Sequence, residues 1–201
     1  MHIIWVQPTL ALVLGYLLGS IPFGLLLTRL SGAGDLRGIG SGNIGATNVL
    51  RTGRKGLAAA TLLLDMAKGA LAVMVGKWLA VDGTDYALLS GAAVFLGHCH
   101  PVWLKFIGGK GVATLLGIGF ALSWVVGLGS ALVWLIGMAL SRISSVGGIM
   151  SAVAAPVLAF TLGATAMGIM LTGLALIVLW KHRANISRLR AGTEPRIGAK
   201  S

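Results

Sequence analysis

Long apolar runs constrain this chain more than any other feature. A helix needs about 20 mostly apolar residues to cross roughly 30 Å of hydrocarbon. Runs of this kind, with few charged side chains, occupy residues 3–28, 56–80, about 86–99, 112–140 and 146–181. Of the 201 residues, 56% are hydrophobic and 10% are charged, which is more apolar surface than one soluble domain of this size can bury. The sequence therefore predicts an all-α, polytopic transmembrane bundle.

The two longest runs decide how many helices the bundle has. Residues 112–140 and 146–181 are each too long for one upright helix and short for two full ones. We divide them near Ser123 and near Gly163, which gives about seven helices, some of them short or partly re-entrant. The first run has no basic region before it and no small-residue cleavage site, so we expect it to be retained as the first helix, kinked by its prolines.

Basic residues indicate the orientation of these helices. They lie at positions 29, 37, 51, 54, 55, 105, 110, 142, 181, 183, 188, 190, 196 and 200, besides Lys68 and Lys77. With seven crossings the fourteen positions share one face, whereas the turn with Asp82 and Asp85 on the other face carries no base. The positive-inside rule then predicts an outside N-terminus and a cytoplasmic C-terminus.

This orientation places three polar segments in the cytoplasm: the first polar loop (residues 29–55), the second polar loop (97–114) and the tail (181–201). We treat residues 1–201 as a single membrane-embedded domain. The net charge of +11 is then explained by orientation and by attraction to anionic lipids and substrates. No nucleic-acid partner is needed to explain it.

The first polar loop has the composition of a phosphate-binding loop. Glycines at 40, 42 and 45 let backbone N–H groups surround an anion, and Arg51 adds a guanidinium that fits a phosphate. Short polar donors stand between them, namely Ser41, Asn43, Thr47 and Asn48. The letters also match the G-x-G-x-x-G dinucleotide fingerprint, but that motif follows a strand, whereas this one follows a long apolar helix. A flexible surface loop is the alternative.

The second polar loop presents a lysine from a glycine-rich turn. In the run Gly108-Gly109-Lys110-Gly111, backbone N–H groups and the ammonium can share one anion. The run is not a Walker motif, because Leu104 occupies the place of its first glycine and Gly111 that of its Ser or Thr. An interfacial lysine that snorkels to the membrane surface is the alternative.

His98 and His100 flank Cys99, which suggests a metal site at first sight. Residues two apart on a helix face different sides, and no carboxylate or third histidine lies nearby in sequence, so we predict no metal and no cofactor. We expect His98 to lock the second polar loop against a neighbour. The single cysteine also excludes an internal disulfide framework.

The tail places His182, Asn185 and Arg188 three residues apart, so they share a face if the tail is helical. A histidine beside an amide can polarise a carbonyl or orient a hydroxyl. A basic tail that binds lipid headgroups is the alternative.

Asp65 and Lys68 form an opposite-charge pair inside the second run. A lone charge at the bilayer centre costs roughly 2.5–3.5 kcal/mol on insertion scales. We therefore expect the two side chains to neutralise each other or to face the interior of the bundle, with Lys68 adding positive potential to the site.

Together the three polar segments resemble the motifs of the bacterial membrane-integral acyl-phosphate:glycerol-3-phosphate acyltransferases, the PlsY family. The resemblance covers nearly the whole chain in order: Gly40 to Asn48 with Arg51, then Gly97-His98 through Pro101 to Thr114, then His182, Asn185 and Gly192-Thr193-Glu194. Ile44 and His100 depart from the family pattern at positions where we expect no chemistry.

The resemblance implies a multi-pass enzyme of the bacterial cytoplasmic membrane with its active site facing the cytoplasm. It would transfer a fatty acyl group from acyl phosphate to the 1-hydroxyl of glycerol 3-phosphate, without coenzyme A. The products would be lysophosphatidic acid and phosphate, in the first acylation step of phospholipid biosynthesis.

The site residues follow from the motifs and the resemblance. We assign Ser41, His182 and Asn185 to catalysis. We assign phosphate and glycerol binding to Gly40, Ser41, Gly42, Asn43, Thr47, Asn48, Arg51, Gly108, Gly109, Lys110, Gly111 and Thr114. Supporting roles go to Lys68, His98, Arg188 and Glu194. Direct attack of the hydroxyl is the expected mechanism, and an acyl-Ser41 intermediate with His182 as base is the rival.

Two other classes of protein remain as alternatives. A small transporter of anions or phosphate esters explains the helices, glycines and bases equally well, although such folds usually contain internal repeats and a site at the bilayer midplane. A non-catalytic lipid-binding scaffold would need only the tail. We expect a monomer in contact with membrane lipids.

Overall fold

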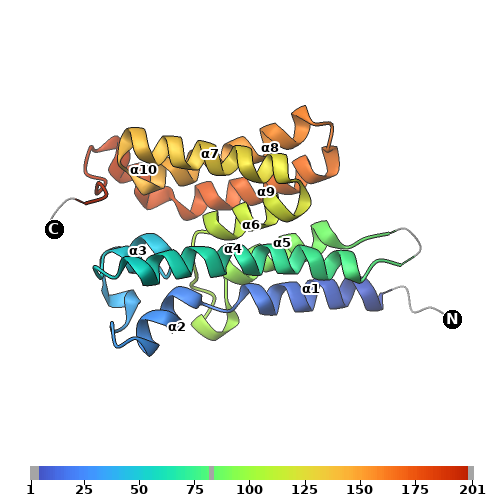
Figure 1. Cartoon of the computed structure of the whole chain (residues 1–201), viewed down its shortest axis with the longest axis horizontal. Helices are drawn as coiled ribbons and strands as arrows, with labels where there is room; N and C mark the ends of the chain where they lie inside the picture. The colour runs from blue at the N-terminus through green and yellow to red at the C-terminus, as the bar shows by residue number, and fades with distance from the viewer. Residues whose placement is uncertain (1–4, 82–83, 199–201) are drawn as a thin grey trace. The chain divides into compact units, whose positions relative to one another are not determined.

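The structure, a computed structural model, describes residues 5–81 and 84–198. Within these ranges the chain is helical and forms no β-strand, apart from an isolated bridge between Val81 and Thr84 (Figure 1). The all-α prediction is thus confirmed, and the dinucleotide motif lacks the strand that it requires. Residues 3 and 4 of the first predicted helix, Asp82 and Gly83 of the predicted turn, and the basic position 200 lie outside the described ranges.

The helices form two compact units, Met1–Leu122 and Ser123–Ser201. Unit 1 contains α1 (Val6–Gly19), α2 (Phe23–Leu30), η1 (Leu36–Gly38), α3 (Ala46–Leu50), α4 (Lys55–Trp78), α5 (Ala87–Cys99), η2 (Val102–Leu104) and α6 (Val112–Leu122). Unit 2 contains α7 (Trp124–Ser141), α8 (Ser144–Thr161), α9 (Thr165–Lys181) and α10 (Arg183–Arg190). The single domain expected for residues 1–201 stays a prediction.

Five helical segments among the described residues are long and apolar enough to cross a membrane: Val6–Leu30, Lys55–Trp78, Ala87–Leu104, Trp124–Ser141 and Ser144–Thr161. Helices α9 and α10 meet at a bend of 59° and could form a sixth span together, whereas α6 is a shorter apolar helix. The protein is therefore a polytopic membrane protein. Its predicted seven crossings and the orientation of its termini stay predictions.

The divisions predicted within the two longest runs are confirmed. Ser123 precedes α7, and its hydroxyl accepts a hydrogen bond from the Val126 N–H. Gly163, between α8 and α9, has a φ of 73°, which glycine adopts without steric penalty. The first run is broken rather than kinked, because α1 ends at Gly19 and α2 begins at Phe23, directly after Pro22. The first polar loop is also more ordered than expected, since it contains η1 and α3.

Small residues let the helices of unit 1 approach closely. Helix α1 packs on α5, and α4 packs on both α5 and α6. A Cβ at Gly19 would overlap the Val94 carbonyl, and one at Gly117 would overlap the Met66 carbonyl. Backbone contacts of this kind are typical of helix pairs in lipid, where small residues replace the usual hydrophobic drive.

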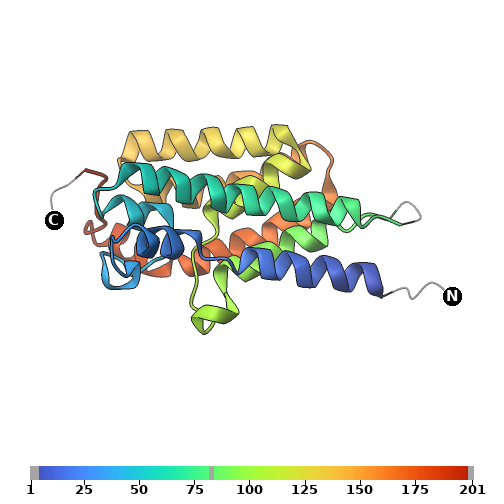
Figure 2. The same ribbon diagram turned by 60° about the horizontal axis from the view of Figure 1, so that its bottom comes forward.

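Unit 2 is built on the same principle. Helix α8 packs against both α7 and α9, and the views of Figures 1 and 2 show α7 and α8 running side by side. Gly147 of α8 lies against the Trp134 carbonyl of α7, 2.5 Å from where its Cβ would be. Large apolar side chains such as Leu140 and Ile169 point outward, 84% and 64% exposed, as expected for helices that face lipid.

Candidate active site

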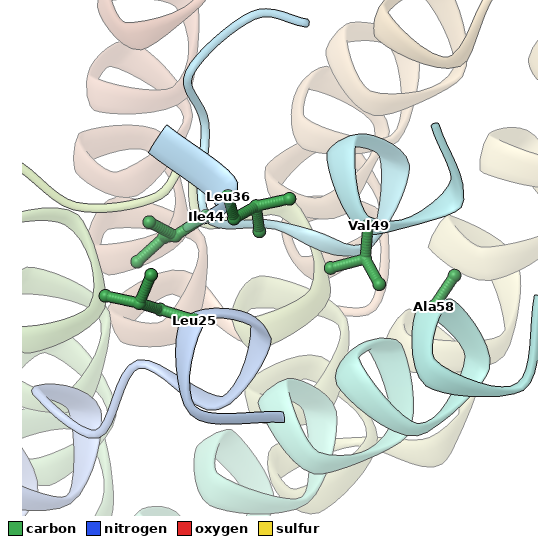
Figure 3. Close-up of a cluster of buried hydrophobic side chains, with 5 residues drawn as sticks. All are labelled: Leu25, Leu36, Ile44, Val49 and Ala58. Carbon is green, nitrogen blue, oxygen red and sulfur yellow. The ribbon is translucent and has the colours of Figure 1, made fainter. Parts of the chain in front are cut away.

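A cluster of buried hydrophobic side chains anchors the first polar loop to its unit. The cluster joins α2, η1, α3 and α4 through Leu25, Leu36, Ile44, Val49 and Ala58, as Figure 3 shows. Ile44 is 4% exposed and lies within this cluster. The loop is therefore a fixed support for its polar residues.

Asn48 holds the polar half of this loop in shape. Its Nδ2 donates to the carbonyls of Leu36 and Ile39, at 3.0 and 2.9 Å, and its Oδ1 accepts from the Ser41 N–H at 3.2 Å. The side chain is 2% exposed. Since both amide protons are engaged within the loop, Asn48 positions Ser41 in this structure rather than presenting donors to a substrate.

The glycine backbone of the loop differs from the predicted ring of donors. The N–H of Gly42 donates to Ile39 O at 2.9 Å, and that of Gly45 donates to Asn43 Oδ1 at 3.2 Å. What the loop does present is side chains: Ser41, Thr47 and Arg51 are all exposed. The glycines thus shape the loop more than they offer N–H groups to an anion.

Gly40 brings Arg51 close to Ser41. A Cβ at position 40 would lie 2.6 Å from Arg51 Nη1, so the guanidinium rests against the Gly40 backbone, directly beside Ser41. The φ of Gly40 is 54°. A hydroxyl and a guanidinium in this arrangement can bind one phosphate between them.

The second polar loop folds back on the end of α5 and contacts His98 there. The Gly109 N–H donates to His98 O at 3.0 Å, and a Cβ at Gly109 would overlap the His98 ring. A Cβ at Gly111, where φ is 85°, would likewise overlap the Phe95 ring. These glycines are needed for close approach, and the predicted locking role of His98 is confirmed. Half-buried Lys110 stands between them.

Thr114, which the sequence analysis assigns to substrate binding, is buried between helices. The residue is fully buried in α6, and its backbone carbonyl packs against Gly69 of α4. Its hydroxyl has no hydrogen-bond partner among the described residues. In this structure Thr114 therefore belongs to the helix interface.

A buried ionic cluster connects the second polar loop to the rest of unit 1. Asp65 Oδ1 lies 2.7 Å from Lys68 Nζ and 3.6 Å from His98 Nδ1, and the Asp65 and Lys68 side chains are 4% and 1% exposed. Lys68 Nζ also donates to the Ile21 carbonyl at 2.8 Å, in the break between α1 and α2. The expected neutralisation of Asp65 by Lys68 is confirmed. The cluster additionally joins three helical segments.

In unit 2, Glu194 organises the residues of the tail. Its Oε1 accepts hydrogen bonds from Asn185 Nδ2 and, at 2.7 Å, from Ser145 Oγ of α8, and its Oε2 accepts from Arg188 Nε at 2.7 Å. Burial opposes ionisation of this carboxyl. The hydrogen bonds from Asn185, Ser145 and Arg188 outweigh burial and hold the pKa of Glu194 below its ordinary value.

His182 is fixed by a backbone carbonyl. Its Nδ1 lies 2.8 Å from Val178 O, which can only accept a hydrogen bond, so Nδ1 carries the proton. In the neutral ring Nε2 is then the atom with the lone pair, as a base acting on a hydroxyl requires. The ring is 3% exposed and stands at the bend between α9 and α10.

A pocket of about 330 Å³ joins the first two polar loops. Its walls come from Arg37, Gly42 and Ile44 of the first loop and from Trp103, Leu104, Lys105, Ile107 and Gly108 of the second. We call it the loop pocket. The sequence did not indicate that Arg37, Trp103 and Lys105 line a common pocket, because the two bases indicated only the orientation of the helices and Trp103 belongs to no motif of its own. The residues of the tail lie in unit 2, so their convergence with the two loops stays a prediction.

No group of three His, Cys, Asp or Glu side chains that could hold a metal ion occurs within residues 5–81 and 84–198. The groups assembled above are instead hydroxyl, guanidinium, ammonium, imidazole and amide. The hydroxyl, guanidinium and ammonium groups of unit 1 are of the kind that can bind phosphate, and the imidazole of unit 2 is of the kind that can accept a proton.

Comparison with known proteins places the chain in a family. A family model described as glycerol-3-phosphate acyltransferase matches residues 9–192. The chain belongs to the glycerol-3-phosphate acyltransferase family. Curated members include proteins of Mesorhizobium japonicum, 57% identical over 95% of this chain and 96% of that protein, and of Roseobacter denitrificans, 55% identical over 96% of each.

Solved structures of this acyltransferase family support the same conclusion. The fold is similar to crystal structures of PlsY (YgiH), described as an integral membrane glycerol 3-phosphate acyltransferase. The glycerol 3-phosphate form has a TM-score of 0.86 and 37% identity, covering 95% of this chain and 96% of that one. The lysophosphatidic acid form has a TM-score of 0.84 and 35% identity, covering 95% of each chain. The resemblance drawn from the three motifs is confirmed.

The buried Asp65–Lys68 pair predicts strong energetic coupling. Lys68→Met should lower the free energy of unfolding in detergent by about 3–5 kcal/mol, because it leaves the Asp65 carboxylate buried without its cation. The double variant Asp65→Leu/Lys68→Met should be less destabilised than either single variant. Lys55→Met, at an exposed position at the start of the same helix, should change stability by less than about 1 kcal/mol. Additive effects of the two single changes would contradict the coupling.

The lowered pKa of Glu194 predicts a pH dependence of stability. A carboxyl with a depressed folded-state pKa contributes stability that is present above its unfolded pKa, about 4.3, and is lost as pH falls through the folded pKa. Glu194→Gln should therefore lower stability by about 1–2 kcal/mol at neutral pH and remove part of the loss between about pH 5 and pH 3. Thermal unfolding of both proteins across that range measures the difference. Parallel curves would refute the role of the carboxylate.

Proposed function

We propose that this protein transfers a fatty acyl group to the 1-hydroxyl of glycerol 3-phosphate and so forms lysophosphatidic acid. The observation that carries the proposal is family membership over residues 9–192, together with the likeness to PlsY in its glycerol 3-phosphate and lysophosphatidic acid forms. The membrane-spanning helices suit an enzyme whose product is a lipid.

Acyl phosphate is the proposed donor, and coenzyme A is not required. Acyl phosphate brings its own leaving group, so the protein needs only to position two phosphorylated reactants and to stabilise charge. Ser41, Arg51 and Lys110 of unit 1 are the proposed phosphate ligands. The position of the Arg51 guanidinium against Gly40, the residue before Ser41, supports this role.

The proposed reaction is a direct displacement. The glycerol oxygen attacks the acyl carbon, a new ester C–O bond forms, and the bond between the acyl carbon and the phosphate oxygen breaks. The hydroxyl proton passes to His182 Nε2 or to a phosphate oxygen. Asn185, oriented by Glu194, hydrogen-bonds the hydroxyl or the developing oxyanion.

The proposed site faces the cytoplasm from the bacterial cytoplasmic membrane, with the N-terminus outside. The distribution of bases supports this orientation, because it keeps fourteen of the sixteen Lys and Arg residues on one face.

An assay of the purified protein tests the proposal and separates it from transport. Palmitoyl phosphate and glycerol 3-phosphate should yield lysophosphatidic acid and inorganic phosphate, whereas palmitoyl coenzyme A should yield neither. Product formed equally from the coenzyme A thioester would reject the donor assignment. Absence of product from both donors, with uptake of phosphate esters into proteoliposomes, would favour the transporter.

Removal of a phosphate ligand should lower turnover. A charge-assisted hydrogen bond is worth about 1.5–3 kcal/mol, so Lys110→Ala and Arg51→Ala should each reduce kcat/KM at least about tenfold. Arg190→Ala removes an exposed base at the end of α10 and serves as the matched control. Wild-type rates from Lys110→Ala or Arg51→Ala would reject that residue as a ligand. Rapid quenching with radiolabelled donor checks the mechanism, since a covalent acyl-Ser41 would exclude direct attack.

A further inference from the structure

The loop pocket combines an apolar wall with a cationic rim. Ile44, Leu104, Ile107 and the Trp103 ring are apolar, whereas Arg37 and Lys105 carry positive charge. At about 330 Å³ it falls within the range of small-ligand sites. Neither glycerol 3-phosphate nor free phosphate has an apolar part that would use such a wall, whereas an amphipathic anion would use both surfaces.

The charges around the pocket leave a net positive potential. Asp35 accepts hydrogen bonds from Arg37, at 2.6 Å from Nη2 to Oδ2, and from Arg29, at 2.9 Å to the same oxygen. Two guanidiniums thus share one carboxylate. The Lys105 ammonium has no ion-pair or hydrogen-bond partner in the part of the chain that the structure describes. A phosphate dianion would complement these charges.

The turn that carries Lys105 has an unusual backbone. Lys105 and Phe106 are consecutive non-glycine residues with φ of 52° and 62°, in the left-handed region that side chains disfavour. Hydrogen bonds from the N–H groups of Leu104 and Phe106 to the Pro101 carbonyl, at 3.1 and 3.0 Å, hold the turn. Strained backbone of this kind often occurs at ligand sites.

The same turn exposes apolar side chains beside the cation. Trp103 is 60% exposed, Phe106 58% and Ile107 75%. Figure 2 shows the light-green turn projecting from unit 1. Aromatic and aliphatic side chains next to a lysine are typical of surfaces that meet both lipid and water. A ligand with a long alkyl chain could therefore reach the pocket from the membrane.

We propose that the loop pocket binds the head of a long-chain phosphate with a single substituent, the acyl phosphate donor of the proposed reaction. Arg37 and Lys105 contact its phosphate, and Trp103, Leu104 and Ile107 contact the first carbons of its chain. The inference rests on the proposed function for the identity of the donor. The pocket adjoins the proposed phosphate ligands, because Gly42 follows Ser41 and Gly108 precedes Lys110 by two residues.

Binding of hexadecyl phosphate tests the proposal without turnover. This ligand is a long-chain phosphate monoester that has no acyl carbon to transfer. Lys105→Asn removes the charge and suits a left-handed φ. We expect it to weaken binding of hexadecyl phosphate by the full chain in neutral detergent at least fivefold. Lys105→Arg should retain most of the affinity. Lys55→Met, which removes an exposed lysine at the start of α4, should leave it unchanged.

Three further ligands identify what the pocket recognises. Inorganic phosphate and glycerol 3-phosphate should bind Lys105→Asn and the wild type equally, and phosphatidylglycerol should not displace hexadecyl phosphate at equal concentration. Equal weakening of all phosphate ligands would overturn the proposal in favour of a general anion site. Displacement by phosphatidylglycerol would overturn it in favour of a lipid-headgroup site, and unchanged binding of hexadecyl phosphate would overturn it altogether.

Kinetics then separate failure of the pocket from failure of the proposed function. With palmitoyl phosphate as donor, Lys105→Asn should raise the KM for the donor at least fivefold while leaving kcat and the KM for glycerol 3-phosphate unchanged. A wild type that binds hexadecyl phosphate through Lys105 but forms no product would retain the pocket and reject the proposed function. Wild-type kinetics from Lys105→Asn would reject the pocket and retain the enzyme.

Discussion

The buried pair of Asp65 and Lys68 is the interaction on which unit 1 depends. A lone charge inside a membrane helix is expensive, so each side chain requires the other. Lys68 also donates a hydrogen bond to the Ile21 carbonyl, in the break between α1 and α2, where the same carbonyl accepts from the Phe23 N–H. Asp65 faces His98, whose backbone in turn receives the second polar loop. One ionic contact thus fixes a helix break, a helix end and the loop that carries Lys110.

Both units use one buried polar side chain to fix an irregular segment. In unit 1 Asn48 binds the backbone at Leu36, Ile39 and Ser41, and in unit 2 Glu194 binds Ser145, Asn185 and Arg188. Each holds three groups with its hydrogen bonds, and Glu194 reaches as far along the chain as Ser145 of α8. The central side chain thus fixes the local geometry where the backbone is not in a regular helix. The proposed catalytic side chains then stand on rigid supports.

The class of fold, the breaks near Ser123 and Gly163 and the pairing of Asp65 with Lys68 could all be predicted, because they follow from local hydrophobicity and charge. Which polar residues of the loops hydrogen-bond to the backbone and which are exposed could not be predicted. Whether an asparagine faces a substrate or the backbone, as at Asn48, depends on tertiary contacts that no spacing rule reports. The close packing of Gly109 and Gly111 against the rings of His98 and Phe95 likewise depends on tertiary contacts. The loop pocket was missed because its two halves are about sixty positions apart.

The proposed function requires that the two polar loops and the tail all lie on the cytoplasmic side of the membrane, because each of them carries residues proposed for the reaction. Single cysteines placed at 41, 110 and 188 test this most directly, because the native Cys99 is buried and should stay silent. A membrane-impermeant thiol reagent should label all three from the cytoplasmic side of inverted vesicles and none of them in intact spheroplasts. Labelling of any of the three from the outside would contradict the account.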